Sequence, residues 1–170
     1  WSLSSSLPKE QVEYRVRHAD QLPQENFDEA LKRPVILLEE TTILFLYEIE
    51  LLSCVLKTVP SFSLLESVFN KIKYASHQLG GAVNNPTARK ILTILQQHID
   101  KLVLVKENAT DLIDSYVEAL EKHEALLLTE DLYLKHHIKQ RHNVVISGNI
   151  FNILQVLRSN EQIDEEQYQH

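Results

Sequence analysis

Residues 35–56 read VILLEETTILFLYEIELLSCVL, and this stretch decides the expected fold. One set of its side chains recurs at alternating steps of three and four, namely Val35, Leu38, Thr42, Phe45, Ile49, Leu52 and Leu56. Such steps place side chains on one face of an α-helix. A second set at helical spacing comprises Leu37, Leu44, Leu51 and Val55. The stretch therefore predicts a long central helix that begins after Pro34 and ends before Pro60.

Residues that interrupt helices are rare along the whole chain. Only 3 Gly and 5 Pro occur in 170 residues, and these residue types are the strongest local helix breakers. With 44% hydrophobic and 24% charged residues, the composition is that of a globular protein and not of a disordered chain. We therefore predict an all-α fold, an up-down bundle of four to six helices, with a short strap near its N-terminus and a frayed acidic C-terminal tail.

Capping signals divide the remainder of the chain. Ser63 and Glu66 have the spacing of a capping box, and Asn85 followed by Pro86 is typical of a helix start. Residues 87–128 contain no Gly or Pro, so they predict either one long helix or two, and we favour a break near Asn108. Other helices are expected at 8–20, 25–32, 63–79, 130–141 and 150–158, with Gly80 ending the third of these and a short extended piece at 144–146.

The chain is expected to form one domain. Residues 1–7 are predicted to be a flexible arm, residues 8–158 a single helical bundle, and residues 159–170 a disordered acidic tail. Trp1 stands where an initiator Met is expected, and the chain contains no Met at all. The sequence is therefore expected to be a fragment or a processed product, and methionines dropped from it would shift the helical registers.

Composition also narrows the functional classes. A formal net charge of −7 and a pI near 5.6 argue against nucleic acid as a partner, because such binding depends on neutralising phosphates. Glu39, Glu40, Glu48 and Glu50 interrupt the longest apolar stretch, which predicts that no segment spans a membrane. The single cysteine, Cys54, lies among apolar residues and fits a reducing compartment. We expect an intracellular protein, cytoplasmic or nuclear.

No motif with a known reaction is present. The chain lacks the glycine-rich phosphate loops and the GxSxG nucleophile motif. Four histidines fall within residues 123–142, but His136 and His137 diverge by about 100° on a helix, and His137 and His142 are five residues apart. The sequence therefore predicts no catalytic residues, no metal site and no cofactor.

Charge is segregated along the chain. Residues 61–106 contain six cations and two carboxylates, whereas residues 107–134 contain one cation and eight carboxylates. We favour the interpretation that this complementarity sets the register of neighbouring helices. In an up-down bundle, however, several cations would meet at one pole. The candidate anion-binding residues at that pole are Lys71, Lys73, Arg89, Lys90, Lys135, His137, Lys139 and Arg141.

These observations favour a non-enzymatic function. We predict a helical protein–protein interaction module that acts as a scaffold, an adaptor or a subunit of a larger assembly. The alternative is a module that binds an anionic ligand, such as a lipid headgroup, a phosphopeptide or RNA, through the basic pole. Protein partners are expected, and the apolar excess of residues 35–56 fits either a central position or a homodimer seam.

Overall fold

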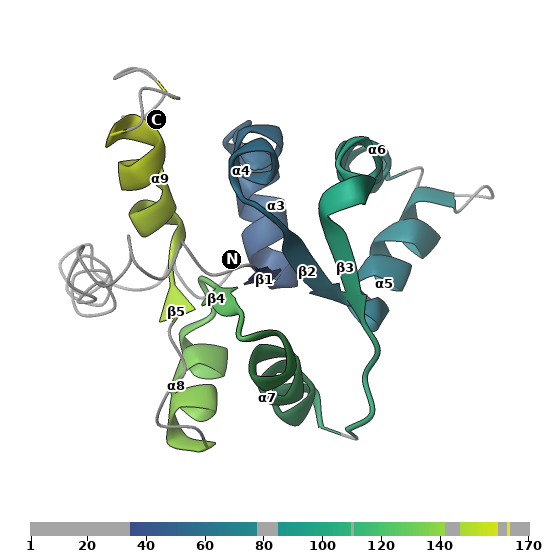
Figure 1. The fold of residues 1–170 in the computed structure, drawn as a ribbon. Helices are drawn as coiled ribbons and strands as arrows, with labels where there is room; N and C mark the ends of the chain where they lie inside the picture. Colours follow the sequence, from purple (N-terminus) through teal and green to yellow (C-terminus); the bar gives the residue numbers. More distant parts are fainter. Residues whose placement is uncertain (1–34, 78–84, 110, 142–146, 160–162, 164–170) are drawn as a thin grey trace, which may run out of the picture.

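The chain folds around a parallel β-sheet with helices on both faces (Figure 1). The computed structural model describes residues 35–77, 85–109, 111–141, 147–159 and 163. The arm, the helices expected at 8–20 and 25–32, the Gly80 cap, the extended piece at 144–146 and most of the acidic tail lie outside the described residues. The predicted division into arm, domain and tail therefore stays a prediction.

Short strands alternate with helices along the described chain. The elements are β1 (Ile36–Leu38), α3 (Glu40–Glu48), α4 (Leu52–Thr58), β2 (Phe62–Leu65), α5 (Glu66–His77), α6 (Pro86–Gln97), the 3₁₀ turn η2 (Ile99–Lys101), β3 (Leu102–Val105), α7 (Leu112–His123), β4 (Leu126–Leu128), α8 (Leu132–Arg141), β5 (Ser147–Gly148) and α9 (Ile150–Ser159). The strands lie in the order β3-β2-β1-β4-β5, and every neighbouring pair is parallel. The predicted all-α bundle is therefore wrong, and the fold class is α/β.

Continuous apolar runs form the three central strands. β1 and β4 consist of fully buried Ile and Leu residues, and β2 is buried at all four positions. Strands of a parallel sheet are covered on both faces, so they lack the alternation of polar and apolar residues that marks a half-exposed strand. Ile36 is the central register position, because it pairs with Phe62 of β2 and with Leu126 of β4. The core is therefore built around β1.

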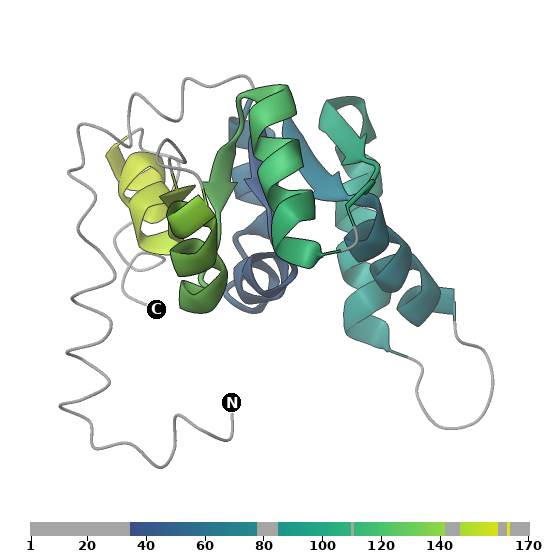
Figure 2. The ribbon, with the colours of Figure 1, turned by 90° about the horizontal axis from the view of Figure 1, so that it is seen from below.

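The crossovers put helices on both faces of this sheet. From β1 the chain proceeds through β2 to β3 in one direction, and it then returns to place β4 and β5 on the other side of β1. Parallel crossovers are right-handed in nearly all proteins, so a reversal of direction moves the connecting helix to the opposite face. Accordingly, α3, α4 and α6 lie on one side of the sheet and α7 and α8 on the other (Figure 1; Figure 2 shows α7 from below). The reversal places a topological switch point between β1 and β4.

The predicted central helix over residues 35–56 is divided into β1, α3 and α4. Glu50 adopts a left-handed conformation with φ 60° between the two helices, and this turn ends the continuous helical stripe. Leu44 and Phe45, which the periodicity places in the core, are 41% and 40% exposed. Leu52 is 1% exposed, as expected. The apolar positions predicted on α4 are therefore buried, but residues 35–56 do not form one helix.

Several expectations outside the strands are confirmed. Asn85 caps α6, since its side chain accepts a hydrogen bond from the Ala88 backbone N–H at 3.1 Å, and Pro86 is the first helical residue. Residues 87–128 are not one helix, although the chain leaves α6 at Gln97 and not near Asn108.

The Ser63 capping box is wrong, because Ser63 is a buried residue of β2. Within the described part of the chain, no helix is long and apolar enough to cross a membrane.

Candidate functional site

The carboxyl ends of β1 and β4 meet beside the switch point of the sheet. Glu39 directly follows β1, and Thr129 to Asp131 follow β4. The Glu39 N–H donates to the Leu128 carbonyl at 3.4 Å, and the Glu130 N–H donates to Thr42 Oγ1 at 3.3 Å. Two segments about 90 residues apart in sequence are thereby held side by side. In open α/β sheets, ligands bind in the crevice at this edge and at this switch point.

A cavity of about 290 Å³ occupies this edge. Four elements contribute to its wall: the β1–α3 junction, α5, the first turns of α7 and the start of α8. The lining residues are Glu39, Glu40, Ser67, Val68, Lys71, Leu112, Ile113, Tyr116, Asp131, Tyr133 and Leu134. Three carboxylates and one ammonium therefore face a single cavity, together with two tyrosines and a short apolar wall. We call this cavity the carboxyl-edge pocket.

Glu39 and Asp131 each cap the helix that follows them. The Glu39 carboxylate accepts from the backbone N–H of Thr41 at 2.8 Å and of Thr42 at 3.3 Å, and Thr41 Oγ1 also donates to it. Glu39 is only 7% exposed, so these donors compensate for the removal of its charge from water. Asp131 accepts from the N–H groups of Tyr133 and Leu134 at 2.8 and 3.0 Å, both through Oδ1.

The two remaining carboxylates near the pocket have partners on α5. Lys71 Nζ lies 2.7 Å from each oxygen of Glu40, and the two side chains are 68% and 32% exposed. Glu107, in the loop after β3, accepts from the Ser67 backbone N–H at 2.8 Å and from the Ser67 hydroxyl. An exposed ion pair of this kind contributes little to stability. Lys71 is therefore free to exchange Glu40 for an anionic ligand at small energetic cost.

Tyr116 of α7 lies at the centre of these groups. Its side chain is 2% exposed and lines the carboxyl-edge pocket. Burial raises the pKa of Tyr116 most, and the charges of Glu39, Glu40, Glu107 and Asp131 raise this pKa further. No hydrogen bond to the Tyr116 hydroxyl is formed within the described parts of the chain. The hydroxyl is thus a donor at neutral pH, and it faces a cavity in which a ligand oxygen would satisfy it.

The acidic groups do not form a protein-only metal centre. Among the residues that the structure describes, no three or more His, Cys, Asp or Glu side chains are grouped so that they could hold a metal ion. Mg²⁺, however, is usually bound by one or two carboxylates together with water and the phosphates of a substrate. Glu40 and Asp131 provide two such carboxylates. The donor set therefore fits a divalent cation whose coordination is completed by a phosphate ligand.

The eight cations expected at one pole lie on three helices. Lys71 and Lys73 are on α5, Arg89 and Lys90 are on α6, and the other four are on α8. Arg89 and Lys90 line a common cavity, which is separate from the carboxyl-edge pocket. Figure 1 shows α8 on the opposite face of the sheet from α6. The eight cations therefore do not gather at one pole, and the structure places them in smaller groups on separate helices.

The α8 cations have neighbours of their own. Arg141 pairs with Asp114 and, at 3.1 Å, with Asp111 at the start of α7. The His137 ring lies 4.1 Å from the ring of Tyr133. The Arg141 pairs join α8 to the start of α7, whereas the contact of His137 lies within α8 and places its ring beside Tyr133, a residue that lines the carboxyl-edge pocket.

Sequence reasoning missed Glu39, Tyr116 and Asp131 as site residues. A signal for two of them exists, because polar residues directly follow the apolar runs of residues 35–38 and 125–128. The polar residues that follow the two runs lie close together only if both runs are neighbouring parallel strands. Because the runs were interpreted as helices, this arrangement was not considered. Tyr116 gives no signal in the sequence, since its position at the pocket depends on how α7 packs.

Comparison with known proteins gives a similar fold among solved structures. No family model and no curated protein matches the chain. Among solved structures, the chain is similar to one described as the structure of the PIN domain endonuclease Utp24. The two chains are 16% identical with a TM-score of 0.47, and the match covers 69% of this chain and 88% of that chain. A likeness of this size concerns the arrangement of elements alone, so no residue role is carried over from it.

These findings correct the predicted function. The non-enzymatic helical scaffold, adaptor or complex subunit is wrong, because its helical bundle does not exist. The alternative, a basic pole at one end of that bundle, loses its geometry for the same reason. The prediction that the chain is not an enzyme is also corrected, because it rested on that helical bundle and the chain is an α/β protein with a polar pocket at the switch point.

Proposed function

We propose that the carboxyl-edge pocket is the active site of a phosphodiester hydrolase. The observation that carries this proposal is the environment of Tyr116, a 2% exposed tyrosine whose hydroxyl has no hydrogen-bond partner among the described residues. Tyr116 lines a cavity together with carboxylates from both sides of the switch point. A phosphate oxygen is a suitable acceptor for this hydroxyl. The endonuclease activity named for the similar structure gives the proposal its specific form, hydrolysis of a nucleic acid.

Each pocket residue has a role in this proposal. Glu40 and Asp131 are the residues that would hold a divalent cation together with the substrate, and such a cation would supply Lewis-acid polarisation of the phosphate. Tyr116 donates a hydrogen bond to a non-bridging phosphate oxygen. Lys71 exchanges Glu40 for the phosphate as its ionic partner. Glu39 is fixed by its contacts to α3, and it contributes shape and negative potential to the wall of the carboxyl-edge pocket.

The chain's net charge of −7 does not conflict with this assignment. The charge is an average over the whole sequence, whereas phosphate binding depends on the local field and on the bound cation. In the carboxyl-edge pocket the carboxylates would hold a cation, whose charge would offset theirs toward a phosphate. The expectation that nucleic acid is not a partner is therefore replaced. The intracellular location stays a prediction that rests on the single cysteine.

Asp131→Asn tests the proposal with little disturbance of the fold. Asn caps a helix about as well as Asp, so the substitution keeps the contacts to Tyr133 and Leu134 while it removes the charge. We expect the wild-type chain to cleave a fluorophore- and quencher-labelled single-stranded RNA in the presence of Mg²⁺ or Mn²⁺. The rate in Asp131→Asn should be lower by at least about tenfold, because loss of a charged ligand weakens cation binding.

Glu118→Gln is the matched control, because Glu118 is an exposed carboxylate of α7 outside the carboxyl-edge pocket. It removes the same charge and should leave the rate unchanged. EDTA should abolish cleavage by every variant. Equal rates in the wild type and Asp131→Asn, or no cleavage by the wild type above a protein-free blank, would exclude this assignment.

A further inference from the structure

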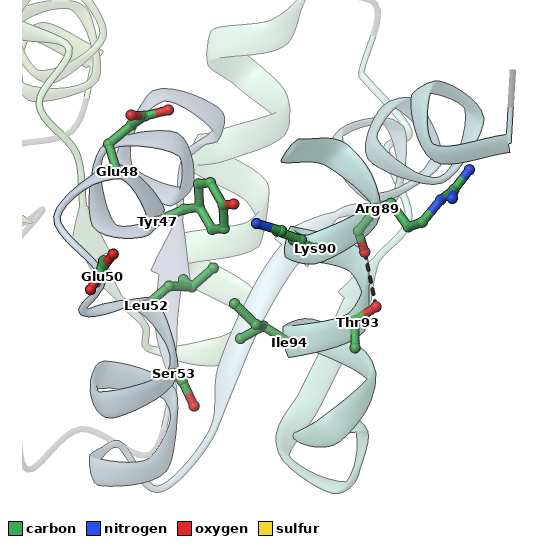
Figure 3. Close-up of a pocket in the computed structure, with 9 residues that line it drawn as sticks. All are labelled: Tyr47, Glu48, Glu50, Leu52, Ser53, Arg89, Lys90, Thr93 and Ile94. Carbon is green, nitrogen blue, oxygen red and sulfur yellow. Dashed lines mark hydrogen bonds between the residues drawn. The ribbon is translucent and has the colours of Figure 1, made fainter. Parts of the chain in front are cut away.

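A second and larger cavity lies on the other face of the sheet. Its volume is about 630 Å³, within the range of small-molecule sites. It is formed by the end of α3, the start of α4 and one side of α6, and it shares no lining residue with the carboxyl-edge pocket. Figure 3 shows that two walls face each other across it, with Tyr47 and Leu52 on one side and Lys90 and Ile94 on the other.

The interior combines an apolar surface with one ammonium group. Leu52 is 1% exposed, and Ile94 and Tyr47 are half-buried, so part of each side chain forms the surface of the cavity. The amine of Lys90 extends across the cavity toward the ring of Tyr47 (Figure 3). In the part of the chain that the structure describes, Lys90 forms no ion pair with a carboxylate. An anion that enters the cavity would therefore not have to displace a protein partner.

The rim restricts the charge of a ligand. The carboxylates of Glu48 and Glu50 lie on the α3–α4 side of the cavity and point away from its centre (Figure 3). Glu50 is held there by its left-handed backbone, with φ 60°, a conformation that is uncommon for residues other than glycine and clusters at functional sites. The lining thus carries two carboxylates and two cations, and of the cations Arg89 points away from the centre of the cavity while Lys90 points into it (Figure 3). With a single ammonium to pair with, ligands that carry several negative charges, such as nucleotides, are disfavoured.

We propose that this cavity binds an organic monoanion with an aromatic or aliphatic body. The anionic group pairs with Lys90 Nζ, and the body lies on Leu52, Ile94 and the ring of Tyr47. A carboxylate or sulfonate on an apolar framework satisfies both surfaces at once. This inference is independent of the hydrolase function and uses one of the cations, Lys90, that the sequence identified as anion-binding candidates.

The probe that tests it is 8-anilinonaphthalene-1-sulfonate, a monoanion with an aromatic body. We expect saturable, single-site binding to the folded chain by fluorescence titration. In ¹H–¹⁵N spectra, the amide shifts that move should cluster at Tyr47, Leu52 and Ile94. Lys90→Glu should weaken binding at least about tenfold, since it replaces a favourable charge contact with a repulsive one.

Lys73→Glu is the matched control. Lys73 is an exposed lysine on α5 that does not line the cavity, so the same change in net charge should leave the affinity within about twofold. Equal affinity in Lys90→Glu and the wild type would overturn the proposal. So would shifts that cluster at Tyr116 and Asp131, because the probe would then occupy the carboxyl-edge pocket. Neither result bears on RNA cleavage, so the two proposals fail separately.

Discussion

Two identical substitutions, Leu127→Ala and Leu44→Ala, distinguish the sheet from a helical bundle. Leu44 belongs to the second helical set of residues 35–56, and Leu127 follows Ile113, Tyr116, Leu120 and His123 at alternating steps of three and four. A bundle therefore predicts similar losses of stability for the two leucines. In the structure, Leu127 is a 0% exposed residue of β4, which pairs with β1 and β5, whereas Leu44 is on α3 and 41% exposed. We therefore expect Leu127→Ala to be much more destabilising than Leu44→Ala.

The magnitudes follow from burial. Leu→Ala removes three carbon groups, and at about 0.8 kcal/mol for each buried group the transfer contribution at Leu127 is about 2.4 kcal/mol. A residual cavity of roughly 60–80 Å³ at about 24 cal/mol per Å³ adds about 1.5–2 kcal/mol, for a total of about 4 kcal/mol. Leu44 is 41% exposed, so its substitution removes little more than half of that transfer contribution and leaves no enclosed cavity, which makes its loss about 1.4 kcal/mol.

Urea unfolding followed by circular dichroism at 222 nm measures this difference. At a common m-value, the two unfolding free energies should differ by about 3 kcal/mol. Thermal melts should show Leu127→Ala lower than Leu44→Ala by roughly 6–12 °C for a chain of this size. Losses that agree within about 1 kcal/mol would refute the reasoning, because Leu44 would then be packed as tightly as Leu127.

Three further outcomes follow from single groups. Burial raises the pKa of Tyr116 above the ordinary tyrosine value of 10.0, so the unfolded chain loses this proton first. The unfolding free energy should therefore fall as the pH rises above about 10, and Tyr116→Phe should reduce that slope in urea titrations. Lys101 Nζ donates to three carbonyls at the end of α4, at 2.6–3.3 Å, and Lys101→Met should lower the unfolding free energy by about 2 kcal/mol. The pKa of Asp111 is lowered chiefly by the Ile113 N–H, so carboxyl ¹³C NMR should place it below 3.8, and Arg141→Gln should raise it only partway.

Helices of this chain were predictable where a cap or an amphipathic face marked them. α6 begins at Pro86 behind the Asn85 cap, as the sequence predicts, and α9 covers the expected residues 150–158 with Ile150, Ile153 and Leu157 buried. These signals are local, because a cap depends on a few neighbouring residues. Local propensity and capping therefore predicted individual helices correctly, although the predicted fold class was wrong.

The strands were not predictable because their residues favour no single interpretation. β1 and β4 are runs of Ile and Leu of only three residues, too short to show a period, and Leu is a strong helix former. Their boundaries also lack glycine. The left-handed positions that end α3 and α7 are filled by Glu50 and Glu124, with φ 60° and 48°, where glycine is the usual residue. The low glycine content therefore indicated uninterrupted helices where the chain in fact turns.

The carboxyl-edge pocket was not predicted from the sequence for a similar reason: a residue that is unusual for its structural role gives no recognisable signal. Glu is an unusual helix cap, yet Glu39 caps α3 with contacts to Thr41 and Thr42, so it gave no capping signal and was counted as surface charge. Within the described residues, Asp131 caps α8 through Oδ1 alone, and no contact there engages its second oxygen. The hydrolase proposal therefore predicts that Glu39→Gln impairs stability more than cleavage, because Glu39 caps α3 with its charge. Asp131→Asn should impair cleavage more than stability, because it removes a charge from the pocket and keeps the cap of α8.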